Sequence, residues 1–205
     1  SPFKAVSEEQ GEILSDVINS KYPYHAVFGE SGTGKSVMFT KLAYELCKNR
    51  ELKNAGSSAK IAMVTSSTLT GSIRKIVKSV DLDNLIDVLT PIKLINNGKK
   101  YNYTLVDEAH KLHRHYTKGQ PNGYKYLKTN QIDLDLIINR TENLILFYDT
   151  EQRIRPINIL NSDFIKFLKK HKFKEYKLTK EFRISPEDVD GTDILNGIKY
   201  ALGVG

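Results

Sequence analysis

The chain has 205 residues, of which 40% are hydrophobic, so it can bury a sizeable core and is not a disordered protein. Its single cysteine, Cys47, excludes an internal disulfide framework and suits a reducing cytosol, so we expect a cytoplasmic protein. The formal charge is +7, from 31 Lys and Arg against 24 Asp and Glu, and no apolar run approaches the roughly 20 residues that cross a bilayer.

The first part of the chain predicts helix, strand and helix. Residues 7–20 have a capping-box spacing, with Ser7 followed by Gln10, and their apolar side chains then recur on one helical face. The apolar run 24–28 predicts a buried strand, and residues 36–49 predict a helix.

The sequence GESGTGKS lies between that strand and the second helix and has the spacing G-x-x-x-x-G-K-[ST]. Its glycines let backbone N–H groups point inward at a helix N-terminus, which is a site for phosphate. Lys35 would reach the β- and γ-phosphates from an exposed loop, and the Ser36 hydroxyl would take one Mg²⁺ position. The alternative is a flexible surface loop. We therefore expect a nucleoside triphosphate and Mg²⁺ as cofactors, bound by Gly29, Glu30, Ser31, Gly32, Thr33, Gly34, Lys35 and Ser36.

The rest of the chain continues to alternate strands with helices. Strands are predicted at 60–66, 85–90, 103–109, 143–149 and 174–179, and helices at 72–80, 132–140, 162–172 and 192–203. Ser162 is the expected N-cap of its helix, and Lys99 and Lys100 the solvated tip of a turn. This alternation predicts an α/β fold with a mostly parallel sheet between helices, whose ligands lie at the carboxyl ends of the strands.

Two of the predicted strands end in polar residues that suit phosphate chemistry. In LVDEAH (105–110), Asp107 is placed to hold the metal, and Glu108 to orient or deprotonate an attacking water. After the strand at 143–149, the amide of Gln152 can hydrogen-bond the water or the γ-phosphate. Acids that merely mark a strand end beside a loop are the simpler interpretation.

Positive charge gathers in two segments that also contain aromatic residues. Residues 111–128, a predicted loop, hold five Lys or Arg, no acid and three tyrosines; residues 166–180 hold seven Lys, one acid, two Phe and one Tyr. This combination suits single-stranded nucleic acid, through phosphate attraction and base stacking, while a solubilising lysine surface is the alternative. Arg153 and Arg155 are further candidates for phosphate contacts, or part of an ordinary polar turn.

His110, His113 and His115 lie close together in the sequence and raise the possibility of a metal site. A zinc site needs about four ligands, and the lone Cys47 is far away in the chain. We therefore interpret His113 and His115 as loop residues, and His110 as part of the segment LVDEAH.

Together, GESGTGKS, VDEAH, YDTEQRI (148–154) and LTKEFRI (178–184) resemble the motifs of the first motor domain of superfamily 1 DNA/RNA helicases. The likeness is strongest to the Schlafen-related, helicase-like ATP-binding family. The resemblance implies one RecA-like ATP-binding domain over residues 1–205. It also implies that Gln10 reads the adenine, that IAMVTSS (61–67) touches the nucleic-acid strand, and that Arg183 approaches the γ-phosphate.

The sequence also departs from the helicase pattern. Tyr148 stands where the motif usually has glycine, there is no tryptophan, and no segment resembles motifs V and VI of a second motor domain. We expect an ATPase that acts with DNA or RNA, with Lys35, Glu108, Gln152 and Arg183 as its catalytic residues. The alternatives are a nucleotide-gated binding or regulatory module with little hydrolysis, and a small-molecule kinase.

Overall fold

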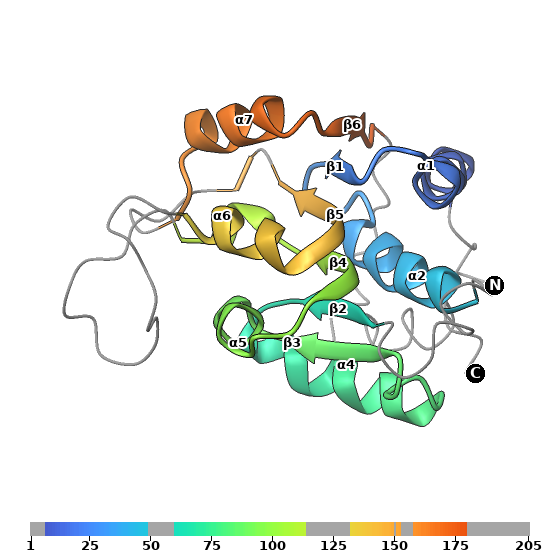
Figure 1. Cartoon of the computed structure of the whole chain (residues 1–205). Helices are drawn as coiled ribbons and strands as arrows, with labels where there is room; N and C mark the ends of the chain where they lie inside the picture. Colours follow the sequence, from blue (N-terminus) through green and yellow to red (C-terminus); the bar gives the residue numbers. More distant parts are fainter. Residues whose placement is uncertain (1–6, 49–59, 114–131, 150, 153–157, 180–205) are drawn as a thin grey trace.

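A parallel sheet forms the centre of the molecule, with its six strands in the order β3-β2-β4-β5-β1-β6, from bottom to top in Figure 1. The computed structural model describes residues 7–48, 60–113, 132–149, 151–152 and 158–179. The strands are β1 (Tyr24–Phe28), β2 (Ile61–Val64), β3 (Ile86–Leu89), β4 (Tyr101–Val106), β5 (Thr141–Tyr148) and β6 (Lys174–Lys177). All of their pairings are parallel, which confirms the predicted α/β fold.

Helices cover both faces of this sheet. The α-helices are α1 (Glu8–Asn19), α2 (Lys35–Cys47), α4 (Ser67–Ser79), α5 (Pro91–Asn96), α6 (Asp133–Ile137) and α7 (Asn161–Lys170), with short 3₁₀ helices η2 (Ala109–Lys111) and η3 (Ile138–Arg140). Helices α1, α2 and α4 contribute to one hydrophobic core, and α5, α6 and α7 to the other. No helix of the described segments is long and apolar enough to cross a membrane.

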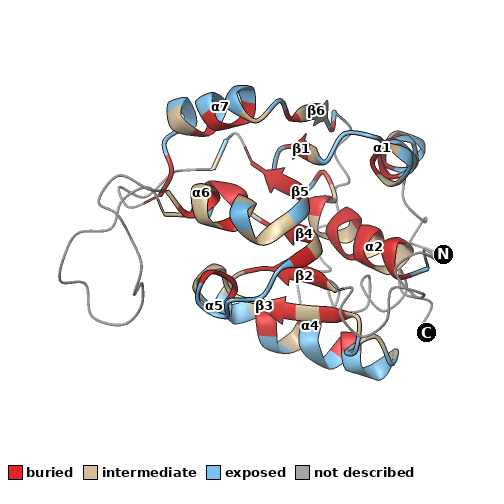
Figure 2. Cartoon of the chain, in the orientation of Figure 1, coloured by how far each residue is buried: buried red, intermediate tan, exposed pale blue. Residues whose placement is uncertain are grey.

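Strand β5 shows why the sequence forms a sheet that is buried on both sides. Its residues from Leu144 to Tyr148 are all buried. Ile145 and Phe147 pack in the core beneath α2, whereas Leu144 and Leu146 pack in the core beneath α6 and α7. A strand covered on both faces needs apolar side chains at consecutive positions, as NLILFY provides. Figure 2 shows the burial concentrated on the strands and on the inward faces of the helices.

Helix α1 begins as the capping-box spacing predicts. The Gln10 backbone N–H donates to the Ser7 hydroxyl at 3.2 Å, and the Ser7 N–H donates to the Gln10 side-chain oxygen at 3.0 Å. The buried residues Ile13, Leu14 and Val17 then turn one face of the helix toward α2. This prediction is confirmed, and it leaves the Gln10 amide nitrogen pointing away from the cap.

Several predicted boundaries differ from the structure. Helix α4 begins at Ser67 rather than residue 72, and the helix predicted at 132–140 is α6 followed by the 3₁₀ turn η3. The strand predicted at 103–109 is β4, which begins at Tyr101 and ends at Val106, because Glu108 has left-handed backbone angles. Helix α5 was not predicted, since six residues are too short to establish a periodicity.

The predicted cap of α7 is wrong. The Leu160 carbonyl accepts the N–H groups of Asp163 at 3.0 Å and Phe164 at 2.9 Å, so the helix starts at Asn161 with Leu160 at the N-cap. Ser162 therefore lies inside the first turn. The helix predicted at 192–203 lies outside the described residues.

A polar cluster around Asp87 holds the amino-terminal ends of β3 and β4 together. The carboxylate of Asp87 accepts the Tyr101 hydroxyl at 2.9 Å and the ammonium groups of Lys60 and Lys99, each at 3.3 Å. Lys99 is thus not simply a solvated tip, although its side chain remains half exposed. Burial alone would raise the pKa of Asp87, but the Tyr101 hydroxyl and the two ammonium groups hold that pKa below its ordinary value.

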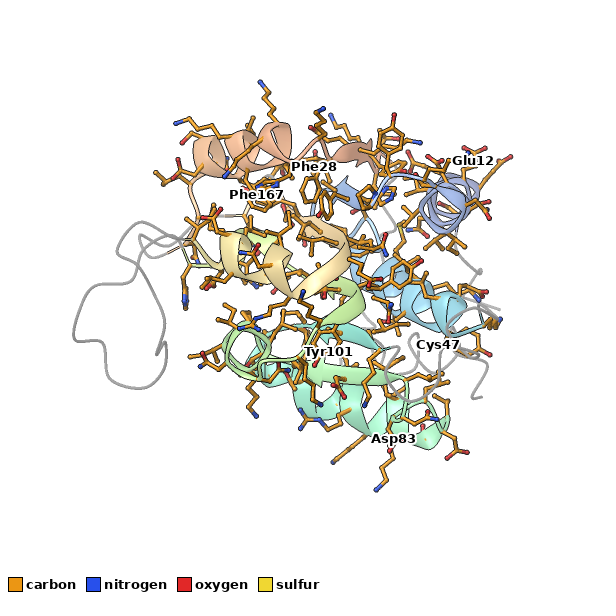
Figure 3. All side chains as sticks on the ribbon, in the orientation of Figure 1. Glu12, Phe28, Cys47, Asp83, Tyr101 and Phe167 are labelled. Atoms are coloured by element: carbon orange, nitrogen blue, oxygen red, sulfur yellow. The ribbon has the colours of Figure 1, made fainter. Side chains whose placement is uncertain are left out.

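We expect Asp87→Asn to lower the free energy of unfolding at pH 7 by about 1 to 2 kcal/mol, because a hydrogen-bonded carboxylate is lost. Since the folded-state pKa of Asp87 lies below the unfolded value, its stabilisation is present above the unfolded pKa and is lost as pH falls through the folded one. The difference from wild type should therefore shrink between pH 7 and about pH 3 in urea unfolding. Asp83→Asn, at an exposed residue (Figure 3), is the control, and an equal loss in both variants would contradict the prediction.

Candidate functional site

The candidate site lies at the carboxyl ends of β1, β4 and β5, where the sequence analysis expects it. The loop 29–34 follows β1 and leads into α2, and the Gly29 N–H donates to the Tyr148 carbonyl at the end of β5, at 3.2 Å. Gly32 and Gly34 have positive φ angles of 83° and 80°, a conformation that favours glycine. A Cβ atom at Gly34 would also lie only 2.5 Å from the Gln10 side-chain nitrogen. The loop therefore requires a glycine at this position.

Lys35 is the most tightly held residue of the loop. Its ammonium donates to the carbonyls of Gly29 at 2.7 Å and Glu30 at 2.6 Å, and to Asp149 Oδ2 at 3.3 Å. Only 9% of Lys35 is exposed, although Glu30, Ser31 and Gly32 of the same loop are exposed, as expected for the loop itself. The side chain folds back beneath its own loop because the carbonyls and the carboxylate there provide the partners that a buried ammonium needs.

Ser36 and Asp107 bring two oxygen groups together beside Lys35. The Ser36 hydroxyl donates to Asp107 Oδ2 at 3.3 Å, across the gap between the start of α2 and the end of β4. Burial raises the pKa of Asp107 to about 6, and the neighbouring charge of Glu108 adds to the effect. A hydroxyl and a carboxylate are hard oxygen ligands of the kind that Mg²⁺ prefers. The pair predicted from the motifs is thus adjacent in space.

Glu108 sits at a sharp bend directly after β4. Its backbone is left-handed, with φ 51° and ψ 48°, and its N–H donates to Asp107 Oδ1 at 3.0 Å. Its carboxylate forms an ion pair with Lys111 one turn later. In this conformation Glu108 is therefore paired with a lysine of η2 and would have to leave it to reach an attacking water.

A chain of hydrogen bonds links Lys35 to His110. Asp149 Oδ2, which accepts from Lys35, also accepts the Gln152 amide N–H at 3.1 Å, and the Gln152 oxygen lies 3.0 Å from His110 Nε2. The Asp149 backbone N–H donates to His110 Nδ1 at 3.3 Å, so Nδ1 carries no proton and Nε2 donates to Gln152. Burial lowers the pKa of His110, which favours this neutral ring. The chain joins the ends of β1, β4 and β5.

Asp149 is a buried charge with several donors. Burial alone would raise its pKa, but the Glu151 N–H, the Lys35 ammonium and the Gln152 amide together hold that pKa below its ordinary value. The Glu151 N–H donates to Oδ1 at 3.0 Å, while the other two donors bind Oδ2. Sequence reasoning noted this acid at the strand end but did not identify it as the partner of Lys35.

Tyr148, at which the sequence departs from the helicase pattern, packs against the hydrogen-bond chain at His110. Its ring stacks on Phe164 of α7, with centroids 4.0 Å apart, and stands edge-on to His110 at 5.7 Å. Its hydroxyl donates to the Asn161 side chain at the start of α7. Phe28 completes the aromatic group on this face of the sheet, where Figure 3 also labels Phe167. A glycine at 148 would remove these contacts.

Gln10 lies against the loop. It is 3% exposed, and its amide nitrogen donates to the Thr33 carbonyl at 2.8 Å while its oxygen accepts from Ser7. The neighbouring Glu9 accepts the N–H and the hydroxyl of Thr179, at 3.1 and 2.7 Å. Helix α1 therefore holds both the loop and the chain that leaves β6, whose Leu178 N–H donates to the Phe28 carbonyl at 2.8 Å.

The structure places two of the three histidines, His110 and His113, in different surroundings. His110 belongs to the hydrogen-bond chain, whereas the His113 N–H donates to the buried carboxylate of Asp133 at 2.9 Å. Among the described residues, no group of three or more His, Cys, Asp or Glu side chains is placed to hold a metal ion. His115, Arg153, Arg155 and Arg183 lie outside the described residues.

The aromatic residues of the segment 166–180 do not form a stacking surface. Phe167 and Phe173 are buried in the core beneath α7, and Tyr176 is partly buried, with its ring stacked on His25. The spacing of Phe167 from Phe164 and Leu168 is the ordinary pattern of a helix that packs on a sheet. The sequence interpretation of these side chains as base-stacking groups is therefore wrong.

Residues 24–191 match the family described as Schlafen group 3, DNA/RNA helicase domain. The chain belongs to this family. The match covers the loop 29–36, the acids Asp107, Glu108 and Asp149, and Gln152. The predicted resemblance is therefore confirmed, and the chain is a helicase-type motor domain with a RecA-like fold. Among curated proteins, none matches the chain.

Among solved structures, the chain is similar to the crystal structure of the Pyrococcus furiosus Hef helicase domain. Its TM-score is 0.45 and its sequence identity 10%, over 82% of this chain. The chain spans 36% of that protein's length.

Proposed function

We propose that this family member binds ATP with Mg²⁺, hydrolyses it, and acts on DNA or RNA as a helicase-type motor domain. The observation that carries the proposal is the meeting of Ser36 and Asp107 at 3.3 Å beside the Lys35 ammonium. Lys35 and Ser36 begin helix α2, whereas Asp107 follows strand β4, 71 positions after Ser36. Together they supply the cation and the oxygen ligands that phosphoryl transfer uses.

The loop and the start of α2 would bind the triphosphate. Among the described residues, the first backbone hydrogen bond of α2 is donated by Met38 to Gly34 at 3.0 Å, so earlier N–H groups remain for an anion. Ser36 and Asp107 would hold Mg²⁺, which supplies positive charge to the phosphates. Gln10, fixed against Thr33 with one amide hydrogen still available, would contact the base.

Hydrolysis would depend on Glu108 and Gln152. Glu108 would leave Lys111 and prepare the water, while Gln152, whose amide is oriented by Asp149 and His110, would contact the γ-phosphate or that water. Arg183, which lies outside the described residues, is assigned to the γ-phosphate from the resemblance. The support from described residues is that its segment leaves β6 beside Gly29, because a Cβ at Gly29 would lie 3.2 Å from Leu178.

A nucleotide-gated module with slow hydrolysis is the second candidate, and the ion pair of Glu108 with Lys111 favours it. In that function the nucleotide changes the domain's affinity for a partner, and turnover stays low. Steady-state ATP turnover, measured with and without single-stranded DNA and RNA, separates the two. A motor predicts turnover that nucleic acid stimulates, a gated module predicts nucleotide binding with little turnover in either condition, and no nucleotide binding would overturn both.

For nucleic acid, we predict that neutralising Lys118, Lys125 and Lys128 weakens single-strand binding more than neutralising Lys169, Lys170 and Lys172. The first set lies outside the described residues but follows directly after Asp107 and Glu108 in the chain. The second set is exposed on and after α7, and the aromatic residues on either side of it, Phe167 and Phe173, are buried.

Binding isotherms at several salt concentrations test this prediction. Each lost phosphate contact should reduce the slope of log K against log salt by about 0.7 for a single strand. Equal effects of the two triple variants would contradict the ranking. No strand binding by the wild type at low salt would contradict the nucleic-acid part of the function.

A further inference from the structure

The ammonium of Lys35 already donates to oxygen atoms of the protein, in the way that it would donate to the oxygens of a phosphate. Three oxygens surround it, and one of them, Asp149 Oδ2, belongs to a carboxylate that is only 1% exposed. The two backbone carbonyls belong to the same loop as Lys35 and move with it. Asp149 belongs to the end of β5 and provides the only full negative charge that pairs with Lys35 among the described residues.

We propose that Asp149 is an internal competitor of the triphosphate for Lys35, and so sets the affinity of the site for nucleotide. This inference rests on the proposed function, since it concerns the same loop. ATP can take Lys35 only by separating a buried ion pair, and the separated Asp149 carboxylate would then lie near the phosphates. Both effects oppose binding. The ionised state of Asp149 is favoured by its other donors, Glu151 and Gln152.

The same exchange would carry a signal away from the loop. Asp149 Oδ2 is shared between Lys35 and the Gln152 amide. When Lys35 leaves, Gln152 becomes the remaining side-chain donor to that oxygen, and its own oxygen is held by His110. When Lys35 leaves Asp149 for a phosphate, the hydrogen bonds of Gln152 and His110 therefore change before any bond in the nucleotide is broken.

The test is the affinity for ATP of Asp149→Asn and of Asp149→Ser, a smaller neutral variant that keeps an oxygen acceptor, in Mg²⁺ and in EDTA. We expect both variants to bind ATP about tenfold more tightly in both buffers, which is the size of effect that a change of about 1.4 kcal/mol gives. Asp16→Asn is the matched control. It also removes a carboxylate from an ion pair with a lysine, in this case the exposed pair between Asp16 of α1 and Lys174 of β6. Its affinity should stay within about twofold of wild type, as for other exposed pairs.

Weaker ATP binding by the Asp149 variants would point to a different role for this residue. If Asp149 instead helps to hold Mg²⁺, the neutral variants will bind ATP more weakly in Mg²⁺ and unchanged in EDTA, which would overturn the competitor role. Unchanged affinity in both buffers would overturn it as well. If the wild type binds no nucleotide at all, the proposed function fails first, and the two failures are therefore distinguishable.

A measurement on the wild-type protein guards against variants that do not fold. With ¹⁵N-labelled lysine side chains, addition of inorganic triphosphate in EDTA should shift the Lys35 ammonium resonance, which is assigned from its absence in Lys35→Arg. The Lys174 resonance, from the control pair, should not move. A Lys35 resonance that stays in place while triphosphate binds would show that Asp149 keeps its partner, and the inference would be wrong.

Discussion

Lys35→Ala should abolish measurable binding of ATP with Mg²⁺, because it removes the positive charge that would move from Asp149 to the phosphates when ATP binds. Titration calorimetry of wild type and variant measures the effect. Lys41→Ala is the matched control: it removes a lysine of the same helix that pairs with Glu45 on the surface, and it should bind ATP normally. Unchanged affinity in Lys35→Ala would contradict the assignment of the loop.

The burial of Lys35 adds a consequence for stability. Because its removal leaves the buried Asp149 carboxylate without a cation, we expect the free energy of unfolding to fall by about 3 kcal/mol. The double variant Lys35→Ala/Asp149→Asn should recover part of this loss while remaining unable to bind ATP. Thermal melts before each titration separate loss of binding from loss of fold, and a melt unchanged by Lys35→Ala would show that the ion pair contributes little.

Glu108→Gln should keep ATP binding and lower the rate of hydrolysis by roughly 10²-fold or more, the usual scale for removing a general base. The glutamine retains the shape of the side chain but cannot take a proton from water. Its ion pair with Lys111 is also lost, and that pair lies partly in solvent, so the fold should be little affected. Turnover under saturating ATP, with nucleic acid present, is the measurement.

Glu142→Gln is the control for this substitution. Glu142 is an exposed carboxylate near the start of β5, where it accepts a hydrogen bond from Asn102 at 3.0 Å, far along the strand from the candidate site. Its variant should turn over like wild type. If Glu108→Gln also turns over like wild type, Glu108 is not the residue that activates water.

The fold and the order of the motifs are readable in the sequence because they depend on local patterns. Strand β1 is predicted to the residue, since the apolar run 24–28 is bounded by Pro23 and by Gly29. The parallel sheet then brings the ends of β1, β4 and β5 to one edge, so the adjacency of Ser36 and Asp107 follows from topology. This adjacency is therefore predictable without knowledge of any individual side-chain contact.

What the sequence does not reveal depends on which side chain takes which partner. The spacing of GESGTGKS predicts that Lys35 reaches the phosphates, but it does not show that the Gly29 and Glu30 carbonyls and Asp149 are its partners in this structure. In the sequence, Tyr148 is recognisable only as a departure from the helicase motif. Its packing against Phe164 of α7 and His110 of η2 depends on the tertiary structure. The burial of Phe167, in contrast, was predictable from its helical spacing with Phe164 and Leu168 and was obscured by the lysines around it.

The most direct test of the central claim is a crystal structure of this protein with Mg²⁺ and a non-hydrolysable ATP analogue. We predict that the phosphates lie in the loop 29–36, that Ser36 and Asp107 share the metal site, and that the Lys35 ammonium has left Asp149 for a phosphate oxygen. A nucleotide bound elsewhere, or one bound in the loop while Lys35 still pairs with Asp149, would contradict this account.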